Sequence, residues 1–325
     1  MNLKFIVRAD ANPLVGSGHI MRCLPLIEVL TELKYEVEVW GDISDLPWVE
    51  QAISNAGARL QNSLVKGDFL NSRNQVLILD SYTLPIDSDF LRSEKWRKVI
   101  VLGDTNTPNY PCDLFVNSTI SKFAANPRSK ARYFLSGPEF IMVRSEIINA
   151  KRIRNSHKLT TQKILVSGGA GDYGDFTHSI VKNIMKSEFN FDAIVFSRNA
   201  PDYRYDSRFT FKNIGSGLAK EIEDTSIFLS TAGTSAFDFL TLGGILGLGC
   251  AVENQIDNYL QLQENGLAIG VGTCDDNGIW KVNSENLNSL LGDELLQDML
   301  TLRSMRLFKG DAAQQISREI LTLLS

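Results

Sequence analysis

Residues 8–22 bring together side chains and backbone positions that could carry out acid–base chemistry. In order along the chain, these residues are Arg8, Asp10, Gly16, Gly18, His19 and Arg22. A neutral imidazole can accept a proton, so His19 is a candidate general base. Glycines carry no Cβ and let the backbone pass close to a ligand, and three charges are more than one loop needs for solubility. Because these features coincide, we predict a ligand site here.

The neighbouring sequence predicts how this stretch is held. An apolar run of strand length at 3–7 precedes it, and apolar residues at helical spacing follow it over 20–33. A loop between a strand and a helix lies at the carboxyl edge of an open α/β sheet, where ligands bind. In the first turn of the helix, the dipole disfavours protonation of His19. Pro25 removes a backbone hydrogen bond, so we expect a kink or an early break there. The alternative is a solvated loop edge in which His19 has no chemical role.

Acidic residues end two further predicted strands. The pattern at 75–80 ends in Asp80 and is followed by Tyr82, and the pattern at 99–104 ends in Asp104. Polar residues at the carboxyl ends of neighbouring strands favour a ligand cleft along one edge of the sheet. Each acid could instead be a helix N-cap or a loop acceptor.

The composition limits the class of protein. The chain has 325 residues, 43% of them hydrophobic, and a formal net charge of −5. This length suits two domains of about 150 residues each. The negative charge argues against nucleic acid or an anionic membrane as a partner, and no apolar run reaches the roughly 18 residues that span a bilayer. The four cysteines form no CxxC pair, which favours reduced thiols in a cytoplasmic protein. The sequence does not determine the oligomeric state, for which we expect a monomer.

Two α/β series follow one another along the chain. A polar stretch at 151–158 separates them, and we predict that it is a linker. Residues 1–150 would form a Rossmann-like domain carrying the histidine loop, and residues 151–325 a second Rossmann-like domain that binds a nucleotide. The further elements that we expect are strands at 35–40, 114–117, 163–167, 193–196, 208–211, 227–230 and 245–252, helices at 48–53, 176–185, 218–224 and 236–242, and helices over 284–325 that break near 309–311.

The second series contains loops suited to an anion. They are Gly168, Gly169 and Gly171 after the strand 163–167, Gly233, Thr234 and Ser235 before the helix 236–242, and Asn254 and Gln255 after the strand 245–252. Free backbone amides in such loops can bind phosphate oxygens. Either glycine loop alone could be a tight turn, but two in one domain favour a diphosphate. The sequence has neither a Walker A lysine pattern nor a complete GxGxxG fingerprint.

Two α/β halves with these sites resemble the GT-B architecture, in which two Rossmann-like domains face one another across a cleft. The run Arg8-x-Asp10 with Gly16-x-Gly18-His19-x-x-Arg22 resembles, more closely, the signature of the nucleotide-sugar hydrolases of pseudaminic acid biosynthesis, which act on UDP-2,4-diacetamido-2,4,6-trideoxy-β-L-altropyranose. Weaker similarity lies at 78–82, Asp104, Gly137, Arg144, Glu146, 168–169, 230–242 and 254–255.

The resemblance implies a role for each site residue. His19 would activate water, which displaces UDP at the anomeric carbon, and Asp10 or Asp80 would orient the imidazole or the sugar hydroxyls. The residues that would contact the sugar substrate are Arg8, Gly16, Gly18, Arg22, Tyr82, Asp104, Asn254 and Gln255. Those that would hold the nucleotide are Gly168, Gly169, Gly171, Gly233, Thr234, Ser235 and Asp238, the last in place of a glutamate in the family. Neither a metal nor another cofactor is implied.

Four departures from the family, counting Asp238, bear on the sugar and the nucleotide more than on the fold. Ser81 stands where a histidine is usual, Thr105 stands where an acid is usual, and Asp172 comes one residue late. Two other functions therefore stay open. A GT-B glycosyltransferase would use His19 to deprotonate an acceptor hydroxyl, and a non-catalytic protein would only bind the nucleotide sugar.

Overall fold

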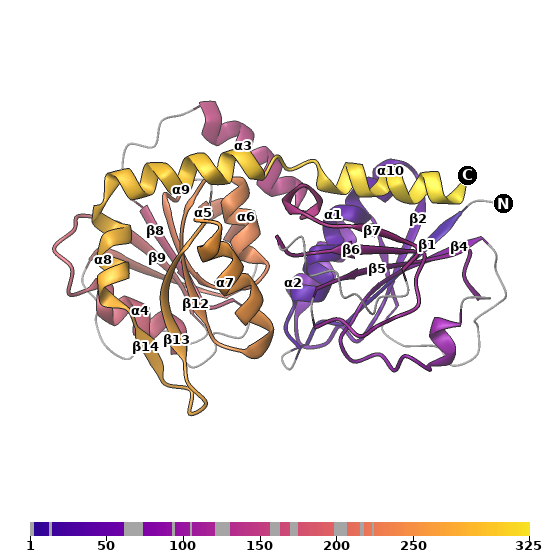
Figure 1. Ribbon diagram of the computed structural model, residues 1–325, viewed down its shortest axis with the longest axis horizontal. Coiled ribbons are helices and arrows are strands. Elements are labelled where there is room, and N and C mark those ends of the chain that lie inside the picture. The colour runs from indigo at the N-terminus through magenta and orange to yellow at the C-terminus, as the bar shows by residue number, and fades with distance from the viewer. Residues whose placement is uncertain are drawn as a thin grey trace. The chain divides into compact units, whose positions relative to one another are not determined.

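The computed structural model describes residues 3–12, 15–61, 74–92, 95–104, 106–120, 131–156, 163–169, 175–197, 207–214, 218–222 and 224–325. The chain divides into two units (Figure 1). Unit 1 comprises Met1–Arg144 and Gly310–Ser325, and unit 2 comprises Ser145–Lys309. Each unit is built around one sheet and is described by itself.

The sheet of unit 1 is entirely parallel. Its strands are β1 (Lys4–Ala9), β2 (Glu36–Trp40), β3 (Arg59–Gln61), β4 (Gln75–Asp80), β5 (Lys98–Gly103), β6 (Leu114–Asn117) and β7 (Tyr133–Leu135). The spatial order is β3-β2-β1-β4-β5-β6-β7, so the order reverses between β1 and β4. Ligands bind outside the carboxyl ends of the strands at such a reversal. The residues that end β1 and β4, Ala9 and Asp80, are paired across it.

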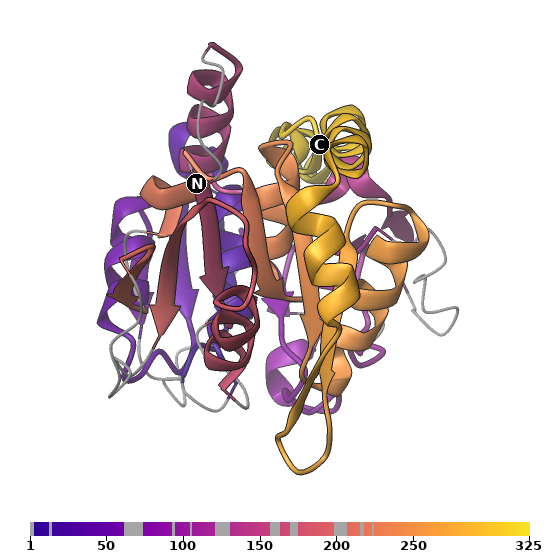
Figure 2. The ribbon, with the colours of Figure 1, turned by 90° about the vertical axis from the view of Figure 1, so that its left-hand side faces the viewer.

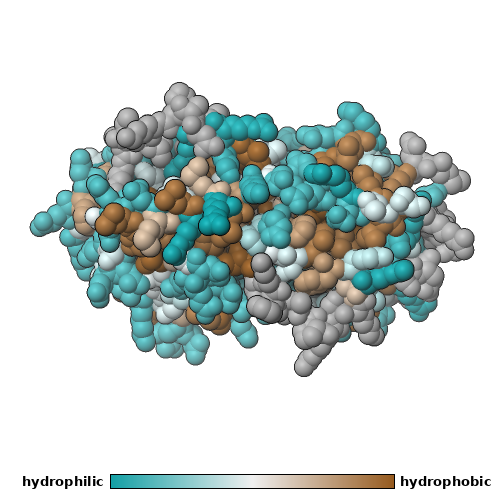
Figure 3. Space-filling model, turned by 45° about the horizontal axis from the view of Figure 1, so that its top comes forward, coloured by the Kyte–Doolittle hydropathy of each residue, from teal (hydrophilic) through white to brown (hydrophobic). Residues whose placement is uncertain are grey.

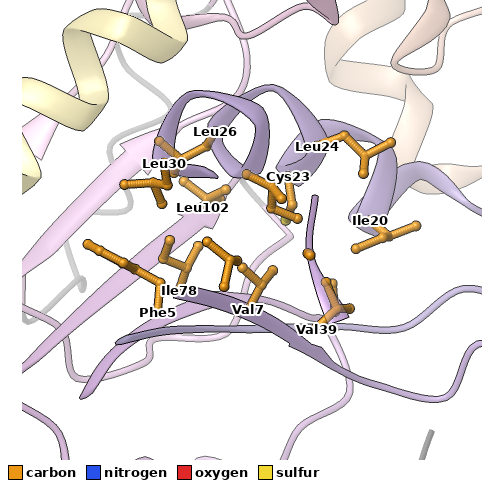
Figure 4. Close-up of a cluster of buried hydrophobic side chains, with 14 of the residues drawn as sticks. Phe5, Val7, Ile20, Cys23, Leu24, Leu26, Leu30, Val39, Ile78 and Leu102 are labelled. Carbon is orange, nitrogen blue, oxygen red and sulfur yellow. The ribbon is translucent and has the colours of Figure 1, made fainter. Parts of the chain in front are cut away.

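Helices α1 (Gly18–Glu32), α2 (Pro47–Asn55) and α10 (Ala312–Leu324), with the short 3-10 turn η3 (Pro138–Phe140), cover one face of this sheet. The 3-10 turn η1 (Asp89–Leu91) packs on the other face, in the core cluster of Ile6, Leu77 and Leu79. Figure 4 shows Leu26 and Leu30 of α1 facing Phe5, Val7 and Ile78 of the sheet. Pro25 lies inside α1, which continues to Glu32, so the early break expected at this proline is wrong. Burial of the neighbouring leucines outweighs one missing backbone hydrogen bond.

Unit 2 repeats the same topology with one change. Its strands are β8 (Lys163–Ser167), β9 (Asp192–Ser197), β10 (Phe209–Asn213), β11 (Ile227–Thr231), β12 (Ile245–Cys250), β13 (Ile269–Cys274) and β14 (Trp280–Val282). The order is β10-β9-β8-β11-β12-β13-β14, and among these described strands only the β13–β14 pair is antiparallel. The order reverses between β8 and β11, which places the ends of these two strands at one site.

The helices of unit 2 lie on both faces of its sheet. They are α3 (Ser145–Ser156), α4 (Phe176–Ile184), α5 (Leu218–Ile222), α6 (Ser235–Thr241), α7 (Ile256–Glu264), α8 (Ser284–Gly292) and α9 (Glu294–Leu307), with the 3-10 turn η5 (Glu253–Gln255). Figure 2 shows them beside the strands, with the β13–β14 hairpin extending beyond the sheet. The sequence patterns did not predict β3, β7, α7, β13 or β14.

The predicted linker at 151–158 is wrong where the structure describes it. Residues 151–156 belong to α3, and 157–162 lie outside the described residues. The helix has few apolar residues, but Ile147 and Ala150 are buried. Lys151 Nζ donates to the Phe308 carbonyl at 2.6 Å, and Arg154 donates to the carbonyl of Thr225. Basic side chains that donate to backbone carbonyls help to hold this helix in place. Such contacts produce no apolar periodicity in the sequence.

The placement of the last helix differs from the predicted division at residue 150. Helix α10 lies beside α1 in unit 1 (Figure 1). Its residues Ile316, Ile320 and Leu324 are part of the core of unit 1, and Arg97 donates to the carbonyl of Leu324. The apolar stripe of α10 predicts that it covers a sheet, but it does not indicate which one.

We predict that loss of the α10 contact loosens unit 1. Ile320→Ala removes a fully buried side chain, which typically costs about 2–5 kcal/mol. Hydrogen exchange should then accelerate in 18–32, the segment of α1, and stay unchanged in 227–231 of unit 2. The exposed Glu319→Ala serves as the control. If both segments respond equally, or if α1 does not respond, the assignment of α10 to unit 1 fails.

Candidate functional site

His19 and Asp80 form the centre of a buried polar cluster in unit 1. His19 is the second residue of α1, and Asp80 is the last residue of β4. His19 Nδ1 lies 2.6 Å from Asp80 Oδ1, and the two residues are 8% and 0% exposed. A carboxylate can only accept, so Nδ1 carries a proton. In the neutral form of His19, Nε2 would then hold the lone pair, which is the arrangement that the predicted general base requires.

Arg22 binds the same carboxylate from one turn further along α1. Its Nη2 donates to Asp80 Oδ1 at 2.6 Å, and its Nε donates to Asp80 Oδ2. Its Nη1 donates to Asp104 Oδ2 at 3.1 Å. The spacing of three residues places His19 and Arg22 on one face of the helix. Burial lowers the pKa of Arg22, but the two carboxylates raise it well above its ordinary value, so the guanidinium stays charged.

Tyr82 and Asp104 complete the cluster. The Tyr82 hydroxyl donates to Asp104 Oδ2, and its ring meets the His19 ring edge-on, with centroids 4.4 Å apart. Asp104 Oδ1 accepts from the backbone amide of Asn106 at 3.0 Å. Burial raises the pKa of Tyr82; Arg22 opposes this rise and Asp104 adds to it, so the net pKa is raised and the phenol stays a donor. Tyr82 thus packs against the imidazole and holds Asp104.

Asp10 has a different set of partners. It accepts from Arg8 Nη2 at 2.9 Å and from the backbone amide of Asp42 at 2.7 Å. The Asp42 carboxylate accepts from Asn12 Nδ2 at 3.0 Å, and Asn12 in turn accepts from the amide of Val15. Of the two candidate orienting acids, Asp80 contacts His19 directly, whereas these contacts connect Asp10 to the loop. Asp42 and Asn12 are residues that the sequence patterns missed.

The two glycines of the loop serve different purposes. Gly16 has φ +74°, a left-handed conformation that side chains rarely adopt, and a Cβ there would meet open space. Gly18 is the first residue of α1. The conformation of the loop therefore accounts for Gly16 without any ligand.

The predicted nucleotide residues gather at the edge of the second sheet. Gly168 follows β8, and its carbonyl accepts from Thr231 Oγ1 at 3.3 Å across the β8–β11 reversal. Gly169 has φ +75°. Gly233 precedes α6, and a Cβ there would meet open space. Gly171 lies outside the described residues.

The remaining predicted residues of unit 2 differ in exposure. Thr234 is the N-cap of α6, where its side chain makes no capping hydrogen bond, and Ser235 is the first residue of the helix. Asp238 is buried in α6, and Asn254 is exposed. Gln255 is buried, and its Oε1 accepts from the amide of Ala251 at 2.9 Å. The side-chain carbonyl of Gln255 therefore closes the turn after β12.

In the described part of the chain, the cysteines and His178 are weaker candidates for a chemical role. All four cysteines are free thiols, as predicted, and His178 is exposed on α4. Cys23 lies 3.8 Å from Asp80 Oδ2, and burial and that carboxylate raise its pKa well above its usual value. Among the described residues, no group of three acidic, histidine or cysteine side chains could hold a metal ion. None of the described helices combines the length and apolar character needed to cross a bilayer.

The sequence matches no family model and no curated protein, but solved structures match over nearly the whole chain. The glycotransferase of kitacinnamycin is 15% identical over 98% of this chain and 99% of its own, with a TM-score of 0.64. UDP-GlcNAc 2-epimerase from Neisseria meningitidis, bound to UDP-GlcNAc, is 13% identical over 98% and 100%, with a TM-score of 0.60. Arabidopsis thaliana UGT89C1 complexed with UDP is 11% identical over 100% of both chains, with a TM-score of 0.66.

The chain has the GT-B fold. Its two Rossmann-like sheets confirm the fold class expected from the sequence. Sequence identities this low establish only the fold. The roles assigned to His19 and to the nucleotide loops therefore stay predictions.

We predict that Asp80 fixes the tautomer of His19. With three histidines in the chain, ¹⁵N-histidine labelling gives a spectrum simple enough to assign by substituting His157 and His178 in turn. In its neutral form, His19 should show a protonated Nδ1 and an unprotonated Nε2. Asp80→Asn should remove this preference, while Asp10→Asn, which leaves the imidazole contact in place, should keep it. An unprotonated Nδ1 with a protonated Nε2 in the wild type would contradict this geometry.

The buried carboxylate also predicts how stability depends on pH. Burial raises the pKa of Asp80, but the charges and hydrogen bonds of Arg22 and His19 lower it further, so the net pKa lies below its usual value. Such a group stabilises the fold above its unfolded pKa of about 3.9, and this contribution is lost as the pH falls through the folded pKa. The stability advantage of wild type over Asp80→Asn should therefore shrink below about pH 4.

Urea unfolding at a series of pH values tests this expectation. The tryptophan fluorescence reports mainly on unit 1, which holds Trp40, Trp48 and Trp96. The exposed Asp87→Asn in unit 1 is the matched control and should show no such change. A difference between wild type and Asp80→Asn that stays constant down to pH 3 would mean that Asp80 is not a stabilising carboxylate.

Proposed function

We propose that the protein is a cytoplasmic nucleotide-sugar hydrolase. It cleaves a UDP-activated 2,4-diacetamido-2,4,6-trideoxyhexose to the free sugar and UDP, as in the biosynthesis of pseudaminic acid-type sugars. The observation that carries the proposal is the 2.6 Å contact between His19 Nδ1 and Asp80, which leaves Nε2 as the acceptor of the imidazole. The motif at 8–22 supports the same substrate class.

In the proposed reaction, His19 acts on water. Nε2 takes one proton while the water oxygen forms a bond to the anomeric carbon. The bond from that carbon to the β-phosphate oxygen breaks, and its electron pair leaves with UDP. The formal charges of Asp80, Asp104 and Arg22 sum to −1 beside a neutral imidazole, so the imidazolium that forms brings the cluster to zero. One positioned base of this kind typically contributes about 10²–10⁴-fold in rate.

The leaving group would be held by unit 2. Backbone amides near Gly168, Gly169 and Gly233 are suited to the diphosphate, and Asp238 would bind the ribose. Solved structures of this fold that contain UDP or UDP-GlcNAc support a UDP site. A diphosphate stabilised in this way needs no dedicated acid, because UDP is a good leaving group.

A glycosyltransferase is the second candidate, and a specific observation favours it. Several structures with the same fold are glycosyltransferases. Nε2 of His19 would then deprotonate an acceptor hydroxyl in place of water. The two reactions share the base and the UDP site and differ only in their dependence on an acceptor. A protein that only binds the nucleotide sugar would release no UDP in either case.

We predict that UDP appears without an acceptor and that His19→Ala removes about 10²–10⁴-fold of the rate. The measurement is UDP release from UDP-2,4-diacetamido-2,4,6-trideoxy sugars. His178→Ala is the matched control, because this histidine is exposed on α4 and should not affect turnover.

Calorimetric binding of UDP separates the possible failures. UDP binding without release in the absence of an acceptor would refute the hydrolase, and release on adding hydroxyl acceptors would then identify a transferase. Release that is unchanged in His19→Ala would remove His19 from the mechanism.

A further inference from the structure

Two Asn-Gly dipeptides occur in the chain, and both lie in unit 2. Asn265-Gly266 ends α7, and Asn277-Gly278 lies at the tip of the β13–β14 hairpin. Asparagine before glycine readily loses its side-chain amide, because no Cβ on the next residue hinders attack by the backbone nitrogen. In both dipeptides an acidic residue comes before and an aliphatic residue comes after. A difference in their reactivity would therefore come from the fold.

The end of α7 holds both reacting groups of Asn265. Its Nδ2 donates to the Gln261 carbonyl at 2.8 Å, so the amide that would leave is bound to the helix. The attacking group would be the nitrogen of Gly266, which donates to the Gln263 carbonyl at 2.8 Å. Gly266 has φ +61°, the left-handed conformation in which glycine commonly ends a helix. Both groups are thus engaged in the structure that ends the helix.

Arg303 adds a further contact at this position. Its Nη1 donates to the Gly266 carbonyl at 3.4 Å, and a Cβ on Gly266 would lie 1.6 Å from the same atom. Arg303 belongs to α9, which lies on the side that Figure 3 brings forward. Attack by the Gly266 nitrogen requires this backbone to rotate, which would break these contacts. The fold therefore opposes the reaction at Asn265.

The hairpin tip constrains Asn277 much less. Residues 276–279 are all exposed, and the hairpin extends beyond the sheet (Figure 2). A Cβ on Gly278 would meet open space. The Gly278 nitrogen donates to the Asp275 carbonyl at 2.9 Å, and the Asn277 nitrogen donates to Asp275 Oδ1 at 3.0 Å. Hydrogen bonds in an exposed turn open far more readily than those in a packed helix end.

We propose that Asn277 is a site of spontaneous deamidation, from which the fold protects Asn265. The Gly278 nitrogen forms a bond to Cγ of Asn277, and the bond from Cγ to Nδ2 breaks. The proton of the Gly278 nitrogen passes through water to the leaving nitrogen, which departs as ammonia. Water then opens the cyclic imide. Opening at Cγ gives aspartate, and opening at the backbone carbonyl gives isoaspartate, in which the chain runs through the former side chain.

Either product changes the hairpin tip. It adds a negative charge beside Asp275 and Asp276. Isoaspartate also inserts a methylene into the backbone, which disrupts the turn in which Asp275 Oδ1 accepts from the nitrogens of Asn277 and Ile279. The isoaspartyl carboxylate is a substrate for protein methyltransferases that use S-adenosylmethionine to esterify this group. The proposal does not depend on the enzymatic function.

Peptide mapping by mass spectrometry tests the proposal on the wild-type chain, aged at mildly alkaline pH in water labelled with ¹⁸O. The peptide with Asn277 should take up the label at least about tenfold faster than the peptide with Asn265, a ratio that one or two hydrogen bonds account for. In urea, where the fold is lost, the two peptides should be labelled at similar rates. This comparison needs no variant, so misfolding cannot produce the result.

Methylation by an isoaspartyl methyltransferase is the second measurement. The aged wild type should accept methyl groups, Asn277→Gln should remove most of this reaction, and the matched control Asn265→Gln should keep it. Equal labelling of the two peptides in the folded chain would overturn the proposal. So would an Asn277 peptide that is labelled only in urea, or methylation that persists in Asn277→Gln.

Discussion

Asp80 is the residue on which the site in unit 1 depends. It is fully buried at the end of β4, where an ionised carboxylate without partners would be prohibitively costly. Two side chains of α1, His19 and Arg22, supply those partners. Removing one partner of a buried ion pair typically costs about 3–5 kcal/mol, so this carboxylate ties the start of α1 to the central strand. The same contacts that stabilise the charge also orient the imidazole.

The topology of unit 1 explains why these residues meet. β1 and β4 are neighbours at the reversal of strand order, so the loop after β1 and the residue that ends β4 share one edge. Asp104, after β5, comes from the next strand and reaches the same guanidinium. The parallel sheet therefore aligns three strand ends, and α1 places two side chains one turn apart over them.

Several of these residues were predictable from the sequence, and the others were missed for physical reasons. Asp80 and Asp104 could be found because each ends an apolar strand pattern. Arg22 was assigned to the substrate, although its spacing of three from His19 on a helix is what directs both side chains to one carboxylate. Asp42 and Asn12 fasten the loop through contacts between segments far apart in the chain, and such contacts leave no periodic pattern.

The domain organisation was harder to predict for a related reason. The apolar stripe of α10 predicts a helix that packs against a core. The chain forms two similar sheets, however, and sequence periodicity does not indicate which of them the helix covers. The segment 151–156 of helix α3 was mistaken for part of a linker because it has few apolar residues; Lys151 and Arg154 there bond to backbone carbonyls, and the buried Ile147 and Ala150 lie before it. Polar contacts of this kind produce no apolar periodicity from which a helix could be predicted.

The hydrogen bonds that Asp80 and Asp104 already make limit the type of chemistry that unit 1 can support. Both oxygens of Asp80 accept hydrogen bonds from Arg22, and its pKa is lowered, so it is a poor nucleophile and a poor acid. Asp104 accepts from Arg22, from Tyr82 and from a backbone amide. A covalent glycosyl intermediate on either acid would require breaking these contacts. Nε2 of His19 is the basic atom of the cluster that the Asp80 contact leaves as an acceptor. For the reaction proposed above, the cluster therefore favours a single displacement, with a general base acting on the incoming oxygen, over a double displacement through an acid.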